Sequence, residues 1–361
     1  MIRKVAILLA TVLVLIISTI GCGDSDQEIQ TTITPTQGLN GTPTTQPITL
    51  KLVTSPLANS PDGQTYYHFA ELMEKYTDGQ VLVDIYPGSQ LFPATEQWEA
   101  VVSGAVDIFA DSTYYVYNYV PDVMVFYIDG LWESYEQAYA ALEDSELPQI
   151  LATKIDQTGP VKTLCILPGV TTACIVNSVR ETQQLMDLEG FRTQSAPGAP
   201  PPALYDYTGM AAIPLSYEET STAFIQGVLD AIHRPPHVIT AFKTHETAKH
   251  ALCRTSWFTS YALIINRDSW EALSSNIQDI ILNKVVPETY EFAKMTFREA
   301  EAEALELIQQ NVDTLHWVTQ EDMDAYLEYA KTHPIIRTQM LMVDPEIIDI
   351  IDELRPSNEH D

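Results

Sequence analysis

Residues 81–91 read Val-Leu-Val-Asp-Ile-Tyr-Pro-Gly-Ser-Gln-Leu, a strand-like run that ends in a Pro-Gly turn. On either side of this run, apolar residues at helical spacing predict a helix, and alternating residues beyond each helix predict a further strand. The predicted elements are, in chain order, a strand over 48–54, a helix over 64–76, the strand over 81–86, a helix over 96–103 and a strand over 106–110. Because short connections join these elements, their order predicts a parallel or mixed sheet with helices on its faces.

The alternation of strands and helices returns in the middle of the chain. Further predicted elements are strands over 162–167, 173–177, 191–195, 211–214, 229–233 and 257–266, and a helix over 217–226. The last third is helical over 268–311 and 319–332, and Pro287 is expected to kink or restart the first of these helices because proline lacks the N–H. The pattern predicts an α/β protein of two lobes with a ligand cleft beyond the carboxyl ends of the strands.

The predicted domain boundaries follow from this pattern. Residues 48–165 together with 250–267 are expected to form the first α/β lobe, and residues 166–249 the second. Residues 268–361 are expected to supply the long helices that end the chain.

The chain opens with a predicted targeting signal. Two basic residues precede a 13-residue run over 5–17 that is apolar except for Thr11, a length that suits a signal peptide and falls short of the about 20 residues of a membrane-spanning helix. Gly21-Cys22 resembles a bacterial lipobox, although Thr19 stands where leucine is commonest. We therefore expect residues 1–21 to be removed and Cys22 to carry lipid. The alternatives are ordinary signal cleavage beside an incidental cysteine, and an uncleaved anchor.

Residues 22–47 have the composition of a tether. They are rich in threonine and proline and contain no aromatic residue, so they cannot bury a core. A flexible coil of this length has a root-mean-square reach of roughly 25–30 Å. We expect an extracytoplasmic protein anchored to the cell membrane by lipid, on its periplasmic side or at the cell surface.

The charge of the chain limits its partners. Lys and Arg number 19 against 49 Asp and Glu, which gives a formal net charge of −30. Nucleic acids and anionic lipid surfaces need clustered positive charge, so both are unfavourable partners. An anionic ligand would have to be held by a few local cations against this field.

The cysteines do not predict a disulfide framework. Only Cys165, Cys174 and Cys253 follow Cys22, and an odd number cannot pair fully. Cys165 and Cys174 lie in strand-like runs and are expected to be small buried apolar residues rather than a bridge. No C-x-x-C occurs, so no thiol-type zinc or redox site is predicted.

Five segments carry a family pattern. They are 86–91, similar to Y-P-x-S/G-Q-L; 98–107, a helix-to-strand step ending in Gly-x-x-Asp; 187–192, similar to D-L-K-G-L-K-x-R; 213–219, similar to P-x-x-x-S-E-V-Y; and 226–230, similar to Q-x-G-V-V-D-G. In this order and spacing, the chain over about 48–330 resembles the substrate-binding proteins of TRAP transporters (tripartite ATP-independent periplasmic transporters), the DctP-like family. The resemblance implies a periplasmic-binding-protein-like fold of type II, with long helices bridging two lobes. It also implies capture of a small organic carboxylate by lobe closure and delivery to membrane permease subunits.

The resemblance also suggests which cations bind the ligand. It assigns the carboxylate-binding arginine to Arg192, whose planar fork suits a carboxylate. The family's second arginine is replaced, most closely by Thr172. Arg234 stands where the family has a ligand-contacting asparagine, and we expect its guanidinium to face the first lobe from the same cleft. His233 can add a donor or a pH-dependent charge. The alternatives are paired surface arginines and a structural histidine.

Polar and aromatic candidates follow the predicted strand over 106–110. Ser112 sits where family members often place a polar contact to the ligand. Tyr114 and two neighbouring tyrosines, with Trp257 and Phe258 later in the chain, offer apolar walls with polar tips. The alternative for each aromatic residue is packing under a loop.

The sequence contains no motif of an enzyme. G-x-S-x-G, the P-loop and G-x-G-x-x-G are absent, and two prolines between His233 and His237 prevent the helix that would align them on a metal. No enzyme activity, cofactor or metal is predicted. A receptor that presents its ligand to a sensor and, less favourably, an exported hydrolase are the alternatives. Ligands with one and with two carboxylates both stay open.

Overall fold

The computed structural model describes residues 46–129, 131–132, 135–169, 172–195, 202–255 and 258–354. The predicted signal peptide, Cys22, the tether up to residue 45 and Trp257 lie outside the described residues.

The first sheet is mixed and forms around β1 (Ile48–Val53). Its strands follow the order β2-β1-β3-β10-β4, with β2 at Val81–Tyr86, β3 at Ile108–Ser112, β10 at Ser260–Asn266 and β4 at Val161–Pro168. β1 pairs in parallel with β2 and β3, whereas β10 runs antiparallel to β3 and β4. The predicted mixed sheet is therefore confirmed, and a strand from far along the chain lies in its interior.

The helix α1 (Pro61–Tyr76) packs on the first sheet. Ser60 caps it by accepting a hydrogen bond from the Gly63 N–H, and Pro61 suits its first turn. Its buried face, which includes Tyr66 and Phe69, joins the core formed with β1. The remaining helices of this part are η1 (Ala94–Glu96), α2 (Gln97–Val102), η2 (Thr113–Val116), η3 (Pro121–Phe126), α3 (Tyr135–Glu143) and α4 (Leu147–Asp156).

The second sheet has the strand order β11-β9-β5-β8. Its strands are β5 (Ala173–Asn177), β8 (Ala231–Arg234), β9 (His250–Arg254) and β11 (Thr314–Trp317), and β6 (Arg192–Ser195) pairs with β7 (Ala211–Pro214) beside it. The helices of this part are η4 (Leu185–Leu188), α5 (Ala203–Thr208), α6 (Thr220–Ile225), α7 (Pro236–Ala241) and η5 (Thr244–Glu246). β9 runs antiparallel to β5, so residues 250–254 belong to the second sheet rather than to the first lobe as predicted. The return to the first sheet begins only with β10.

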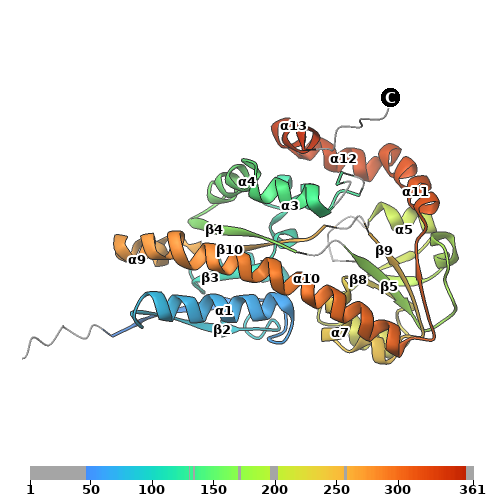
Figure 1. The fold of residues 1–361 in the computed structure, drawn as a ribbon, viewed down its shortest axis with the longest axis horizontal. Helices are drawn as coiled ribbons and strands as arrows, with labels where there is room; N and C mark the ends of the chain where they lie inside the picture. Colours follow the sequence, from blue (N-terminus) through green and yellow to red (C-terminus); the bar gives the residue numbers. More distant parts are fainter. Residues whose placement is uncertain are drawn as a thin grey trace, which may run out of the picture. The chain divides into compact units, whose positions relative to one another are not determined.

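The helix α10 (Val286–Asn311) bridges the two sheets. It packs on α1 and β4 of the first part and on α7 and β11 of the second, and Figure 1 shows it running past both. The predicted restart at Pro287 corresponds to a π-helical turn over Ile281–Val285, after which proline occupies the first turn of α10. Two short helices, α8 (Arg267–Glu271) and α9 (Ser275–Ile280), precede that turn. None of the helices in the described part of the chain is both long and apolar enough to span a membrane.

A second connection between the two parts follows β11. α11 (Gln320–Thr332) packs on α5, α12 (Pro334–Met342) packs on η3, and α13 (Pro345–Glu353) packs on α3. Thr319 caps α11 by accepting a hydrogen bond from the Asp322 N–H. The C-terminal helices therefore cross back from the second part to the first, and Figure 1 shows them in red above α3 and α5.

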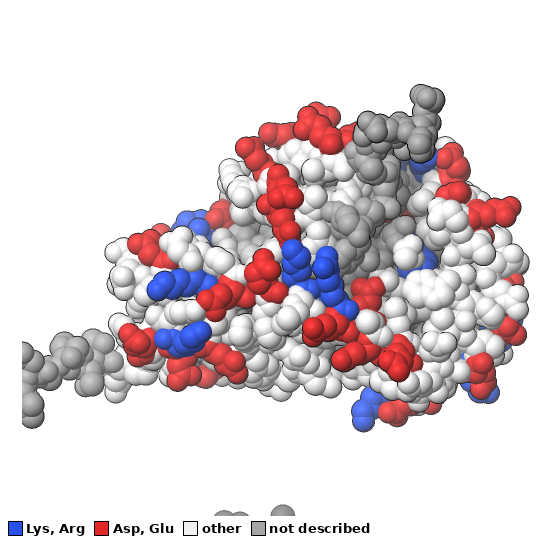
Figure 2. All heavy atoms as spheres, viewed as in Figure 1, with Lys and Arg blue, Asp and Glu red and all other residues white. Residues whose placement is uncertain are grey.

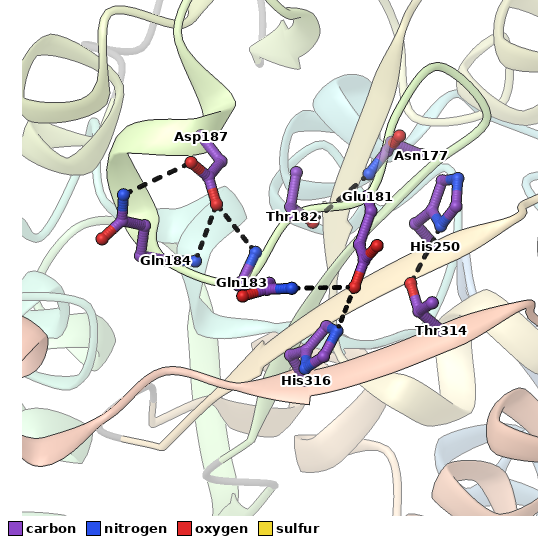
Figure 3. Close-up of polar contacts among 9 residues, drawn as sticks. All are labelled: Asn177, Glu181, Thr182, Gln183, Gln184, Asp187, His250, Thr314 and His316. Atoms are coloured by element: carbon purple, nitrogen blue, oxygen red, sulfur yellow. Dashed lines mark hydrogen bonds and ion pairs between the residues drawn. The ribbon is translucent and has the colours of Figure 1, made fainter.

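Polar contacts position the segment that joins β5 to β6 (Figure 3). The Asp187 carboxylate accepts hydrogen bonds from the backbone N–H groups of Gln183 and Gln184. The Glu181 carboxylate lies 2.9 Å from His316 on β11. This segment thus fixes where β6 enters relative to the second sheet, and β6 carries a side chain of the site described below.

One disulfide corrects the prediction for the cysteines. Cys174 on β5 is bonded to Cys253 on β9, and the two residues face each other in the antiparallel ladder. Cys165 is a free thiol whose pKa burial raises to about 12. Sequence reasoning missed the bridge because it treated Cys174 as a buried apolar residue, and because the strand carrying Cys253 was not predicted.

Removing this disulfide should destabilise the protein. The bonded residues are 79 apart in sequence, and closing a loop of that size in the unfolded chain is worth about 4 kcal/mol. We expect the double variant Cys174→Ala/Cys253→Ala to melt several degrees lower, whereas Cys165→Ala should change the melting temperature less. Alkylation of the denatured protein should label two more thiols after reduction than before it. An equal label count with and without reductant would contradict the bridge.

Candidate functional site

A cavity of about 220 Å³ lies where strands of both sheets end. Its lining includes Ser55 after β1, Asp111 and Ser112 at the end of β3, Gln194 near the end of β6, Arg234 at the end of β8 and Arg254 at the end of β9. Ligand sites in open α/β sheets form beyond strand ends, where side chains from separate strands converge. The cavity therefore lies where the strand pattern predicts the cleft.

Arg234 is the cation without an acidic partner. Its guanidinium donates hydrogen bonds to Gln194 Oε1 and to the His233 carbonyl, and it lies 5.4 Å from the centre of the Tyr217 ring. Among the described residues it takes part in no ion pair within 4.0 Å. A guanidinium that has no acidic partner can bind the carboxylate of a ligand by donating hydrogen bonds to it.

The second arginine of the cavity is already neutralised. Arg254 is 2% exposed and donates to Asp129 at 2.9 Å, and the Tyr326 hydroxyl donates to the other oxygen of the same carboxylate. Although burial opposes its charge, Asp129 holds the pKa of Arg254 above its ordinary value. Arg254, Asp129 and Tyr326 thus connect β9, the segment after η3 and α11 beside the cavity.

Two buried carboxyl groups lie on the first-sheet side of the cavity. Burial raises the pKa of Asp111 from 3.8 to about 7, although hydrogen bonds from Ser55 and from the Ser112 backbone oppose the shift. Asp62, in the first turn of α1, accepts hydrogen bonds from Ser60 Oγ and from the Gly63 N–H on its Oδ1 atom. The cavity is thus acidic on the side formed by the first sheet and α1, whereas Arg234 comes from β8 of the second sheet.

Tyrosines form much of the remaining wall. The lining includes Tyr114, Tyr115, Tyr127, Tyr205, Tyr217 and Tyr261. Burial raises the pKa of Tyr114, Tyr115 and Tyr217, while Arg234 lowers it in each case, so these hydroxyls lie within the electrostatic reach of that cation. The rings supply apolar area with polar tips.

Three predicted residues line the cavity: Ser112, Tyr114 and Arg234. The Ser112 hydroxyl lies 2.7 Å from Tyr127 Oη and accepts from the Tyr114 N–H. Arg234 acts on tyrosines of η2 in the first part, which agrees with the predicted direction of its guanidinium. Trp257 falls outside the described residues, whereas its neighbour Phe258 lines the cavity.

Three other predicted residues are not brought to the cavity. Arg192 is exposed and makes a two-point ion pair with Asp230, with both nitrogen–oxygen distances at 2.7 Å. Thr172 is buried just before β5 but is not part of the lining. His233 is also buried outside the lining, because successive side chains of β8 alternate and Arg234 takes the cavity side. Burial lowers the pKa of His233 well below its ordinary value.

The misplacement of Arg192 has a simple cause in register. Counted from Asp187, the arginine of the D-L-K-G-L-K-x-R segment coincides with Gln194, two residues beyond Arg192. Two residues along a strand span about 6.6 Å, so Arg192 lies at the start of β6 and Gln194 lies that much closer to its cavity end. Arg234 donates to Gln194, so the cation comes here from the neighbouring strand instead.

Sequence reasoning missed several lining residues. Asp111 directly follows the predicted strand over 106–110, so its position at a strand end could have identified it. Arg254 gave no such signal, because β9 is short and was not predicted. Within the described residues, no three His, Cys, Asp or Glu side chains are grouped in a way that could hold a metal ion.

Comparison with known proteins identifies the family. The family model of bacterial extracellular solute-binding proteins, family 7 (DctP), matches residues 52–336. The chain belongs to this family. Its members are solute-binding proteins, so the predictions of an extracytoplasmic binding protein and of no enzyme activity are confirmed. A similar family 7 protein is the C4-dicarboxylate-binding periplasmic protein DctP of Rhodobacter capsulatus, 26% identical over 287 residues, covering 78% of this chain and 84% of that protein.

Solved structures of other solute-binding proteins share the fold. The sugar acid binding protein of Advenella mimigardefordensis, in complex with galactonate, has a TM-score of 0.76 at 20% identity, covering 86% of this chain and 99% of that one. A TRAP periplasmic solute binding protein from Sulfurospirillum deleyianum, with bound succinate, has a TM-score of 0.75 at 19% identity, covering 85% and 99%. The predicted two-lobed α/β fold with bridging helices is confirmed.

The raised pKa of Asp111 should make stability depend on pH. An unfolded aspartate ionises near pH 4, so the folded protein holds one more proton until about pH 7 and loses stability as the pH rises across that window. Asp111→Asn removes the ionisable group. Any stability that the variant loses through weaker hydrogen bonds is the same at every pH. The melting temperature of the variant minus that of the unchanged protein should therefore increase from about pH 5 to about pH 7 and then level off.

The control for this experiment is Asp84→Asn. Asp84 is exposed on β2, outside the cavity, and its substitution changes the net charge equally. A difference that stays constant over the whole range for Asp111→Asn would contradict a raised pKa.

Proposed function

We propose that this family 7 protein captures a small organic acid anion in the cavity between its two sheets and delivers it to the membrane subunits of a TRAP-type transporter. The observation that carries the proposal is Arg234, a cation inside the cavity that has no acidic partner among the described residues. The substrates named for similar proteins, such as C4-dicarboxylates, galactonate and succinate, are all organic acids. Ser112 and Tyr114 are the proposed polar contacts beside the bound anion.

Contacts between the two parts of the chain support capture by lobe closure. Ser89, after β2, donates to the Glu218 carboxylate at 2.6 Å, and Glu218 precedes α6 of the second part. The pair of Asp129 and Arg254 likewise joins the two parts. Glu218, Asp129 and Arg254 line the cavity, and both contacts would separate if the lobes opened, which would couple opening to ligand exchange.

Arg234 should be required for affinity, and Arg192 should not. Truncating one partner of a buried charge pair costs several kcal/mol, and each 1.4 kcal/mol is about tenfold in affinity. For an organic acid found by a thermal-shift screen, we expect Arg234→Ala to weaken binding at least about a hundredfold by calorimetry. Arg234→Lys should recover only part of this loss because lysine cannot form the two-point contact.

Arg192→Ala is the matched control, since it removes an equal charge from an exposed ion pair. Its affinity should stay within about threefold of the unchanged protein, which corresponds to less than about 1 kcal/mol. Equal losses in the two alanine variants would show that the cavity described here is not the binding site.

We also propose that the mature protein is anchored through lipid on Cys22. The support is the short apolar run, the Gly21-Cys22 pair and the composition of residues 22–47. Mass spectrometry of protein from membranes should find a chain that begins at a lipid-modified Cys22. Cys22→Ala should release the protein from the membrane fraction. A mature chain that begins at any other residue would refute the anchor and leave the binding function standing.

A further inference from the structure

The cavity contains more acid than base. Among the described lining residues, Arg234 and Arg254 are the cations, and they face four carboxyl groups: Asp62, Asp111, Asp129 and Glu218. A site built for a ligand with two or more carboxylates needs the opposite balance, because each added anion must be compensated in a region with little water. The second half of the ligand therefore has to satisfy acidic groups.

Two of these carboxyl groups do not need a cation from the ligand. Asp129 is paired with Arg254 and accepts from Tyr326. Glu218 is exposed to solvent, and it accepts from Ser89 Oγ and from the Ala94 N–H. Asp62 and Asp111 on the first-sheet side, and Arg234 on the other side, are left for the ligand.

No lysine or arginine of the described residues is paired with Asp62 or Asp111. Asp111 accepts only hydrogen bonds from Ser55 and from the Ser112 backbone, and Asp62 accepts them on one oxygen only. No ion pair includes either residue in the described part of the chain. The raised pKa of Asp111 agrees with a buried carboxyl that lacks a cation. The Gln339 Oε1 atom is a further buried acceptor of the lining that has no partner among the described residues.

Tyr217 lies close to Arg234 and within the electrostatic influence of Asp62 and Asp111. Its ring lies under the Arg234 guanidinium, and Arg234, Asp62 and Asp111 all act on its hydroxyl. Arg234 is not within 4.0 Å of either carboxyl group, so the charges face one space from separate places. A ligand that binds both Arg234 and the two carboxyl groups must therefore carry a negative group and a positive group that are separated from each other.

We infer that the ligand is an organic zwitterion whose carboxylate binds Arg234 and whose ammonium, several bonds away, binds Asp62 and Asp111 across the tyrosine wall. This inference rests on the proposed function and narrows its substrate class. An ammonium has three donors and a positive charge, which suits two carboxyl groups. A hydroxyl would leave their charge uncompensated, and a second carboxylate would be repelled. Tyrosine rings add a favourable surface for the cation.

The test compares straight-chain carboxylic acids that differ only at the far end. Acids of four, five and six carbons carry an ammonium, a hydroxyl, a carboxylate or a methyl group there, and calorimetry on the mature protein ranks them at about pH 8, where Asp111 is ionised. We expect an amino acid of this series to bind at least about tenfold more tightly than its hydroxy and dicarboxylate counterparts. Its affinity should fall as the pH drops to about 6, because Asp111 then gains a proton.

Two variants locate the ammonium. Asp111→Asn and Asp62→Asn, made separately, should each weaken the amino acid at least about tenfold and leave the dicarboxylate unchanged or slightly tighter. Asp84→Asn, which makes the same charge change on the surface, should alter neither ligand.

The inference is overturned if a hydroxy acid or dicarboxylate ranks first, if both cavity variants leave the amino acid unaffected, or if no amino acid of the series binds up to about 10 mM. A dicarboxylate that binds more tightly than the amino acid of equal length, and loses affinity in Arg234→Ala, would refute the zwitterion and keep the proposed function. If no compound of the series and no acid of the organic acid screen binds, the zwitterion inference and the proposed function are both refuted.

Discussion

The buried pair of Arg254 and Asp129 is the interaction on which the rest of the site depends. Removing a guanidinium from water costs several kcal/mol unless a counter-charge and hydrogen bonds compensate it. Here the compensation comes from a segment of the first part and from Tyr326 on α11, while Arg254 itself sits on β9 of the second sheet. Three distant stretches of the chain must therefore meet at one point, and that point is a wall of the cavity.

The same pair decides which arginine can act on a ligand. Since Asp129 neutralises Arg254, Arg234 is the cation of the described lining that has no acidic partner. The chain as a whole carries a formal net charge of −30, and Figure 2 shows acidic side chains spread widely over the displayed face. Affinity for an anion must then arise from short-range, directed hydrogen bonds in a place with little water rather than from the field of the whole protein.

The disulfide and α10 hold the two arginines of the cavity and the two parts of the chain in position. Cys174 lies opposite Arg234 in the ladder between β5 and β8, and Cys253 directly precedes Arg254. Both arginines of the cavity are thus tied to the same cross-linked pair of strands. α10, packed on both sheets, limits how the two parts can move relative to each other, and the contact between Ser89 and Glu218 lies on the cavity wall between them.

The sequence by itself determined the α/β class and most of the element order, because periodicity and turn residues are local properties that residues 48–110 and 268–332 display clearly. The family and its bridging helices were identified from the resemblance of five motifs. The sequence also identified Ser112, Tyr114 and Arg234, which directly end or follow strands in the chain. Only the tertiary structure decided the rest. The bridge between Cys174 and Cys253, the pairing of Arg254 with Asp129, and the exposure of Arg192 depend on which strands become neighbours and in what register. A shift of two residues along one strand moves a side chain by about 6.6 Å, and only the neighbours that the folded chain supplies decide whether that side chain meets the surface or the cavity.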